Sequence, residues 1–420
     1  MFTKVEHIEQ RRTYMKRNHR LATAVIAALM VLAMALAGCG SGTSGGTSGG
    51  TSGESKTFNI GFGGPITKGD VDFGKGGLRA VQLAVETANK SQDAKDLKIQ
   101  FKVVQGDDQS TAEQAGIVAN TFTADAKNTV GVVGHFNTAA SFAAGPIYNG
   151  AKMVAISYGS TGDKLTQQGW TYIFRTCATD GLQGPSGADR AIALGYKTVA
   201  IVDDQSPYGQ GLVKSFKDEF TKKGGTAVFE DSTPQGNADF SAQVTAIAAK
   251  KPDLVYFGGT YSPDTGAGAV FRAQLVQGGV TVPMMGGDGL YAEGFVTGAG
   301  NAAEGALATC PGQPVVSLAN GKQFSEDYKA KFNMDPAPFD AYAYDATMAI
   351  VNATYKVAKD KGVDQVTSPA GREALRTAVA DSDFDGVTGK IGFTKTGDST
   401  NPVISLYKVI SGKWEFQPKQ

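Results

Sequence analysis

The stretch Lys197–Asp203, KTVAIVD, is followed by a helical pattern at Gly209–Lys223, and this pair sets the rhythm of the chain. Its apolar residues run almost without interruption, whereas a strand with one face in water would alternate apolar and polar residues. Short continuous runs that precede helical patterns are typical of parallel strands covered by helices on both faces. The stretch therefore predicts one strand and one crossover helix of an α/β fold.

The same alternation extends along the chain in both directions. Upstream, strands are expected at Phe58–Phe62, Leu97–Val104, Val130–Gly134 and Lys152–Ser157, and helices at Gly76–Lys90, Ser110–Ala124 and Thr138–Tyr148. Downstream, strands at Thr226–Asp231, Asp253–Gly258 and Val282–Gly286 alternate with helices at Phe240–Lys250 and Ser262–Gln277. Helices at Gln323–Phe332, Phe339–Ala358 and Ser368–Ala380 then precede strands at Lys390–Phe393, Val403–Ile410 and Lys413–Phe416. Two successive series of this kind predict two doubly wound parallel-sheet lobes.

The first residues have the pattern of a lipoprotein signal peptide, residues 1–38. A basic segment precedes an uncharged apolar run at Leu21–Ala37, and Leu36–Cys39 reads as a lipobox. A transmembrane helix is the alternative, since the run is about long enough to span a bilayer. The Gly/Ser/Thr-rich segment 39–56 is typical of a flexible tether, and it favours a lipidated Cys39. The start codon (Met1 or Met15) and the export route (Sec or twin-arginine) stay open.

Composition narrows the possible functions. The formal net charge is zero, which gives no electrostatic basis for binding nucleic acid. Two of the three histidines, His7 and His19, lie in the signal peptide. The remaining His135 cannot form a multi-histidine metal site, and no nucleophile motif surrounds it. We therefore expect no metal, no cofactor and no enzyme activity, and we interpret His135 as a structural residue.

Two cysteines, Cys177 and Cys310, follow the predicted lipidation site. Outside the cytoplasm an even pair favours a disulfide, and two buried free thiols are the alternative.

A helix-capping pattern gives a separate, local prediction. Ser110 and Glu113 have the spacing of a capping box at the start of a helix.

Ligands of doubly wound sheets bind beyond the carboxyl ends of the strands. The residues that follow the predicted strands are rich in Gly, Ser, Thr, Asp and Tyr. They occupy positions 63–68, 135–138, 158–161, 203–208, 259–261 and 286–289. Such side chains suit a small polar or zwitterionic ligand. The adjacent Asp203 and Asp204 are interpreted mainly as strand-end and loop residues.

A family resemblance follows from these positions and their order. The matching segments are Ile156–Thr161, Leu165–Gln167, Phe174–Thr176, Gln183–Pro185, Tyr208–Leu212, Tyr256–Gly259, Met285–Gly286 and Ala303–Gly305. The chain resembles the periplasmic branched-chain amino acid binding proteins, the type I receptors of ABC importers. The resemblance covers nearly all of residues 57–420.

The resemblance implies two lobes that three crossovers join and that close on a ligand. The first lobe would hold residues 57–176 and 311–387, and the second 177–310 and 388–420. The crossovers would lie near Thr176, Cys310 and Val387–Gly389. Because Cys177 and Cys310 then lie on neighbouring hinge strands, the resemblance favours a disulfide between them.

The resemblance also implies a ligand site. Thr138 would bind the ligand carboxylate, although a helix N-cap role also suits a threonine. Ser160 would offer its backbone carbonyl and Thr161 its hydroxyl. In the second lobe, Asp288 would bind the ammonium group. The aromatic lining would come from Phe136 and Tyr208.

Two departures from the family pattern weaken the expected aromatic wall. Thr260 stands where the family has a tyrosine, and the first loop, Ile66–Gly69, is short and has no aromatic residue. The pocket is therefore expected to be wider or more polar than in the family.

The resemblance implies a monomeric, lipid-anchored receptor that delivers an aliphatic amino acid or a small amide to a membrane-embedded ABC permease. A sensory module for a membrane receptor is the second hypothesis, and a hydrolase is the third.

Overall fold

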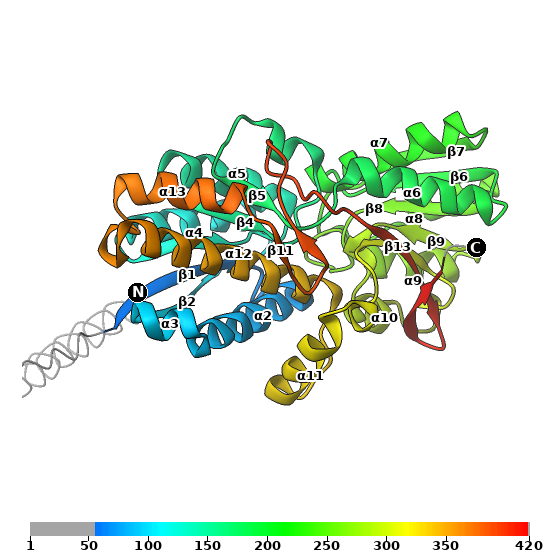
Figure 1. The fold of residues 1–420 in the computed structure, drawn as a ribbon. Helices are drawn as coiled ribbons and strands as arrows, with labels where there is room; N and C mark the ends of the chain where they lie inside the picture. Colours follow the sequence, from blue (N-terminus) through cyan, green and yellow to red (C-terminus); the bar gives the residue numbers. More distant parts are fainter. Residues whose placement is uncertain (1–54, 419–420) are drawn as a thin grey trace, which may run out of the picture. The chain divides into compact units, whose positions relative to one another are not determined.

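Two β-sheets, one parallel and one mainly parallel, form the framework of the chain (Figure 1). The computed structural model describes residues 55–418, apart from the side chain of Pro338. The predicted signal peptide, the lipidation site Cys39 and nearly all of the predicted tether lie outside the described residues.

The first sheet has the strand order β2-β1-β3-β4-β5, and all of its pairings are parallel. Its strands are β1 (Lys56–Gly64), β2 (Ile99–Asp107), β3 (Thr129–Val133), β4 (Val154–Ser157) and β5 (Ile173–Arg175). The helices between them are α2 (Val71–Lys90), α3 (Gln92–Leu97), α4 (Ala112–Ala124) and α5 (Thr138–Gly150). Every residue of β3 and β4 is buried, as continuous apolar runs predict for strands covered on both faces.

The second sheet has the order β14-β13-β10-β9-β8-β6-β7. Its strands are β6 (Thr198–Asp203), β7 (Thr226–Ser232), β8 (Leu254–Gly258), β9 (Met284–Gly286), β10 (Leu307–Pro311), β13 (Ile404–Ile410) and β14 (Lys413–Gln417). Strand β13 pairs antiparallel with β10 and with β14, and the other pairings are parallel. Its helices are α6 (Asp180–Ala193), α7 (Pro207–Lys222), α8 (Ser241–Lys250), α9 (Gly268–Gln277) and α10 (Glu293–Ala299).

Three late helices follow β10; the second and third of them pack on the first sheet, and the first packs against α2. They are α11 (Gly321–Phe332), α12 (Pro338–Lys361) and α13 (Pro369–Ala380), which precede a short hairpin of β11 (Phe384–Asp385) and β12 (Lys390–Ile391). Helix α12 lies against α2 and β3. There the hydroxyl of Tyr355 donates to the carbonyl of Ala88 over 2.9 Å, and Ile350 packs over Gly131. We call the first sheet with α2–α5 and α11–α13 the first lobe, and the second sheet with α6–α10 the second lobe. The predicted α/β class with two parallel-sheet lobes is confirmed.

The chain crosses between the lobes three times: after β5, after β10 and before β13. The third crossover lies later than the expected Val387–Gly389. Asp398 still belongs to the first lobe, because its Oδ1 accepts hydrogen bonds from Arg175 Nε over 2.6 Å and from Thr166 Oγ1 over 2.8 Å. The crossover therefore lies between Asp398 and the start of β13.

Two local predictions are wrong. The N-cap of α4 is Thr111, whose side chain accepts from the amide of Gln114, and not Ser110. Ser110 has a left-handed φ of 59°, and its hydroxyl accepts from the amide of Asp70 instead. Helix α9 begins at Gly268, six residues after the expected Ser262. The preceding residues form a loop in which the Thr265 amide donates to the Ser262 carbonyl.

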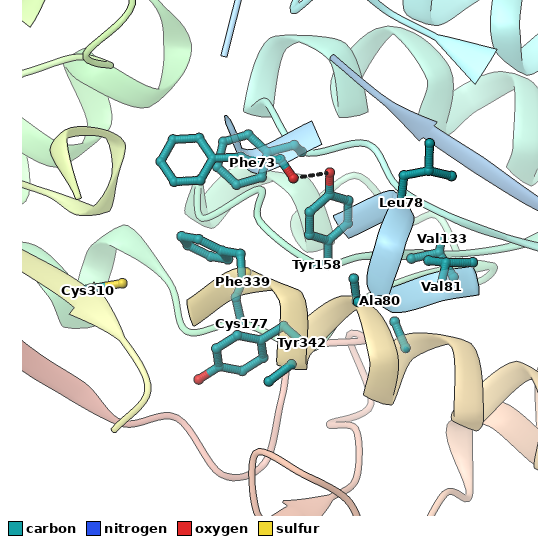
Figure 2. Packing of buried hydrophobic residues seen from close by; sticks show 14 of the residues in the cluster. Phe73, Leu78, Ala80, Val81, Val133, Tyr158, Cys177, Cys310, Phe339 and Tyr342 are labelled. Atoms are coloured by element: carbon teal, nitrogen blue, oxygen red, sulfur yellow. Dashed lines mark hydrogen bonds between the residues drawn. The ribbon is translucent and has the colours of Figure 1, made fainter. Parts of the chain in front are cut away.

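The predicted disulfide is absent. Cys177, just after β5, and Cys310, within β10, are both free thiols with no exposed surface (Figure 2). The Cys177 sulfur instead lies 3.7 Å from the carbonyl oxygen of Ser160, to which it donates. Burial raises the pKa of Cys177 to about 12, so this sulfur is protonated and unreactive at neutral pH.

Candidate ligand-binding site

A cleft lies at the carboxyl ends of the strands, where residues of the two lobes meet. It holds about 430 Å³ of space, counting its opening to solvent. The residues that line it are Ser110, Phe136, Asn137, Thr138, Ala139, Gly159, Asp204, Ser206, Tyr208, Gln235, Thr260, Asp288 and Gly289. Five of the seven predicted ligand-binding residues are among them: Phe136, Thr138, Tyr208, Thr260 and Asp288. Strand-end loops place them together, as expected for a doubly wound sheet.

Thr138 is the first residue of α5, and its side chain is buried at the cleft. The N-cap position belongs to Asn137, whose side chain makes no capping hydrogen bond. The unpaired amides of the first helical turn therefore remain available beside the Thr138 hydroxyl. Such a helix N-terminus suits a carboxylate, because its N–H groups and the helix dipole both favour negative charge.

The other two predicted ligand-binding residues, Ser160 and Thr161, are not among the residues that line the cleft. The Ser160 hydroxyl bonds to the Phe136 carbonyl over 2.9 Å, and the Ser160 carbonyl accepts from Arg175 Nη1 over 3.0 Å. Both groups of Ser160 thus hold the loop in place, and its neighbour Gly159 lines the cleft instead. Thr161 differs, because its buried hydroxyl makes no hydrogen bond with any described residue.

Sequence reasoning missed Asp180, which lies next to Thr161 at the start of α6. It has no exposed surface, and neither carboxyl oxygen has a hydrogen-bond partner within residues 55–418. Burial, followed by the nearby charge of Asp288, raises its pKa well above the usual range. The three-residue strand β5 that positions Asp180 was not predicted, so no strand end drew attention to it.

Asp288 and Tyr208 form one polar unit in the second lobe. The Tyr208 hydroxyl donates to Asp288 Oδ1 over 3.0 Å and accepts from the Gly289 amide, also over 3.0 Å. Burial raises the pKa of Asp288 to about 6, which still leaves it mostly charged at neutral pH. A charged carboxylate at a site with few donors suits a ligand ammonium group.

Aromatic rings form one wall. Phe136 stacks on Phe73 with 4.4 Å between ring centroids, and Phe339 meets both rings edge-on. Figure 2 shows Phe73, Tyr158 and Phe339 converging from separate segments, with the Tyr158 hydroxyl bonded to the Phe73 carbonyl. Because these rings pack on one another, Phe136 presents a firmly held apolar surface to the cleft.

A polar wall of the cleft includes Asn137 and Thr260, and it is backed by Asp70 of the first lobe. Asp70 accepts from Asn137 Nδ2 over 2.7 Å and from Thr265 Oγ1 of the second lobe over 3.0 Å. Burial raises its pKa to about 6. Thr260 joins this wall through its hydroxyl, which lies 2.5 Å from that of Thr265. The expectation of a more polar pocket at Thr260 agrees with this arrangement.

Further contacts join the lobes beside this wall. The Asp72 amide donates to the Tyr261 hydroxyl over 3.3 Å, and the Gly294 amide donates to Asp72 Oδ2 over 2.9 Å. Together with the bond between Asp70 and Thr265, they hold the lobes against each other. The structure therefore shows the cleft in a closed arrangement.

Known proteins with similar sequences and structures agree with this geometry. Residues 57–413 match the family described as periplasmic binding protein. The chain belongs to the periplasmic binding protein family.

An amino acid binding protein of Pseudomonas aeruginosa is 32% identical over 70% of this chain and 77% of its own length. The Leu/Ile/Val-binding protein homolog 2 of Brucella abortus is 30% identical over 78% of this chain and 85% of its own. The crystal structure of a leucine binding protein of Thermotoga maritima superposes with a TM-score of 0.76, at 28% identity, and covers 86% of this chain and 98% of that one.

Membership of the periplasmic binding protein family confirms that the chain is a solute-binding protein and not an enzyme.

His135 has a structural place, as predicted, because its ring nitrogens pair with Asp108 Oδ2 over 2.7 Å and the Tyr148 hydroxyl over 3.1 Å. Within residues 55–418 no group of three or more His, Cys, Asp or Glu side chains could hold a metal ion. No helix of the described part is long and apolar enough to cross a membrane.

Proposed function

We propose that this periplasmic binding protein captures a branched-chain amino acid, or a related small amide, by lobe closure and delivers it to an ABC importer. The observation that carries the proposal is the placement of opposite polar groups across one cleft. Thr138 and the α5 N-terminus offer an anion site on one lobe, and Asp288 offers a carboxylate on the other. A zwitterionic amino acid would satisfy both.

The relatives point to the same ligand class, since their names describe amino acid and Leu/Ile/Val binding. Thr161 and Asp180 extend the ammonium site of the proposal, because Asp180 is buried near Asp288 and Thr161 lies next to Asp180. Phe136 and Tyr208 would contact the ligand as the side walls.

The lipid anchor at Cys39 is part of the proposal. Lipidation would hold the two lobes at the extracytoplasmic face of the membrane, within reach of the permease. Metabolic labelling with a fatty acid, compared between the wild type and Cys39→Ser, tests the anchor. Label that persists on the variant would contradict it.

Isothermal titration of the purified protein against the common amino acids tests the ligand. We expect saturable binding of at least one branched-chain amino acid or amide-bearing amino acid. Absence of binding across the whole set would refute the proposal. A sensory module remains the second candidate, and co-purification of a receptor in place of a permease would favour it.

A further inference from the structure

One acceptor in the cleft has no donor. Asp204 lies just after β6, is fully buried and lines the cleft. Its Oδ1 accepts from the Ser206 amide over 3.0 Å and from the Ser206 hydroxyl over 2.5 Å, which shapes the start of α7. Its Oδ2 has no hydrogen-bond partner among the described residues. A buried carboxylate oxygen without a donor is costly, so a donor from outside the protein is expected.

Two glycines lie close to this oxygen, and only the absence of their side chains leaves space for it. A Cβ atom at Gly259 would lie 2.9 Å from Asp204 Oδ2, and one at Gly266 would lie 3.1 Å from it. Both distances are shorter than ordinary carbon–oxygen contacts, so any larger residue would crowd the oxygen. The backbone thus surrounds the carboxylate closely without supplying a side chain that could pair with it.

The neighbouring wall cannot supply the donor, because its own donors are already engaged. Asn137 Nδ2 and the Thr265 hydroxyl both donate to Asp70. The other amide atom of the same asparagine, Asn137 Oδ1, is a second buried acceptor without a partner. The described lining residues include no lysine, arginine or histidine. Gln235 carries the remaining side-chain amide donor of the described lining, and its side chain is exposed to solvent. The buried side chains at the polar end of the cleft therefore present unpaired acceptors.

We propose that the ligand carries a second hydrogen-bond donor at the end of its side chain, and that this donor binds Asp204 Oδ2. The inference rests on the proposed amino acid function and specifies the side chain. Hydroxyl, amide and ammonium groups share the required chemistry. Purely aliphatic side chains lack it and would leave both acceptors unpaired in a dry pocket.

Pairs of ligands with matched shapes test this preference. Asparagine has nearly the shape of leucine, and threonine that of valine, but each carries a side-chain donor. Titration calorimetry on the full-length protein in mild detergent should show at least about tenfold tighter binding of asparagine than leucine, or of threonine than valine, since losing a bond to a charged group costs about that much. Lysine and ornithine form a further arm, and tightest binding there would identify the donor as an ammonium group.

The variant Asp204→Asn replaces the unpaired hydrogen-bond acceptor with a donor and changes the shape of the side chain little. Its Oδ1 can still accept from Ser206, so the start of α7 is kept, while Nδ2 replaces the free acceptor with a donor. We expect it to lose at least tenfold in affinity for the preferred polar ligand and to bind leucine and valine as the wild type does. Asp203→Asn is the matched control, because Asp203 bonds to Gln205 and Ser232 and does not line the cleft.

The outcomes separate this inference from the proposed function. Leucine and valine binding as tightly as asparagine and threonine, and at least as tightly as lysine and ornithine, would overturn the inference and leave the amino acid function standing. An Asp204→Asn variant with an unchanged ligand preference would also overturn it. Binding of no amino acid at all would overturn both proposals.

Discussion

The hydroxyl of Tyr208 and the carboxylate of Asp288 are joined by a 3.0 Å hydrogen bond inside the cleft. The two residues are 80 positions apart, and each follows a strand of the second sheet, β6 and β9 respectively. The bond fixes the direction of the carboxylate. It also leaves Asp288 dependent on the ligand for a compensating positive charge, because no basic residue is found among the described lining residues.

Removing that carboxylate should therefore weaken ligand binding. We expect Asp288→Ala to reduce amino acid affinity by more than about tenfold, the scale of one lost charge-assisted hydrogen bond. Titration calorimetry measures the change, and thermal melting of the free variant shows whether the fold is kept. A folded variant with wild-type affinity would move the ammonium site elsewhere.

The segments that form this cleft could be predicted from the sequence, because strand ends identify them, whereas the role of each residue came from the family resemblance. Thr138, Tyr208 and Asp288 each follow a continuous apolar run or begin a helical pattern, so the doubly wound arrangement brings them to one edge. Asp180 was missed because β5 has only three residues, too few for a recognisable run. Asp70 was missed because its partner Thr265 is 195 positions away, in a loop that was expected to be helical.

The strands, too, divide into those that the sequence predicts and those that it does not. Buried strands such as β3 and β8 are continuous apolar runs, and their positions were predicted to within a few residues. Strand β10, LATCP, was not predicted, because Thr309 and Pro311 interrupt its apolar pattern. Its place in the sheet depends instead on pairing with β9 and β13, which no local pattern encodes.

Protonation should act in opposite directions on stability and on binding. Burial raises the pKa of Asp70, Asp204 and Asp288 to about 6 each, from an ordinary 3.8. A carboxyl group with a raised folded-state pKa destabilises the fold above that pKa, and the cost disappears as the pH falls toward the unfolded value. The melting temperature of the ligand-free protein should therefore rise between pH 7 and pH 5.

Amino acid affinity should fall over the same interval, because Asp288 must be charged to bind an ammonium group. Melting curves and titrations at pH 5, 6 and 7 measure both effects. In Asp288→Asn the affinity should depend less on pH than in the wild type. A melting temperature that falls from pH 7 to pH 5 would contradict the assignment of raised pKa values.

The two cysteines should behave as protected thiols. In Cys39→Ser, which removes the third cysteine, Ellman's reagent should react slowly with the native protein, because Cys177 and Cys310 are completely buried. Denaturation without reductant should then release two reactive thiols per chain. A count of zero after denaturation would show that a disulfide forms in solution.

Glycines in two helices should respond in opposite ways to a single added methyl group. In α2, a Cβ at Gly74 would lie 1.8 Å from the carbonyl oxygen of Pro65, a backbone atom that cannot move aside cheaply. In α4, a Cβ at Gly116 would have no neighbour within 4 Å. Gly74→Ala should therefore lower the free energy of unfolding by at least ~2 kcal/mol, as overpacking of a tight contact does. Gly116→Ala should raise it by ~0.5–1 kcal/mol, because alanine favours the helix. Chemical denaturation of both variants measures the difference, and equal effects would contradict the close approach of α2 to the first loop.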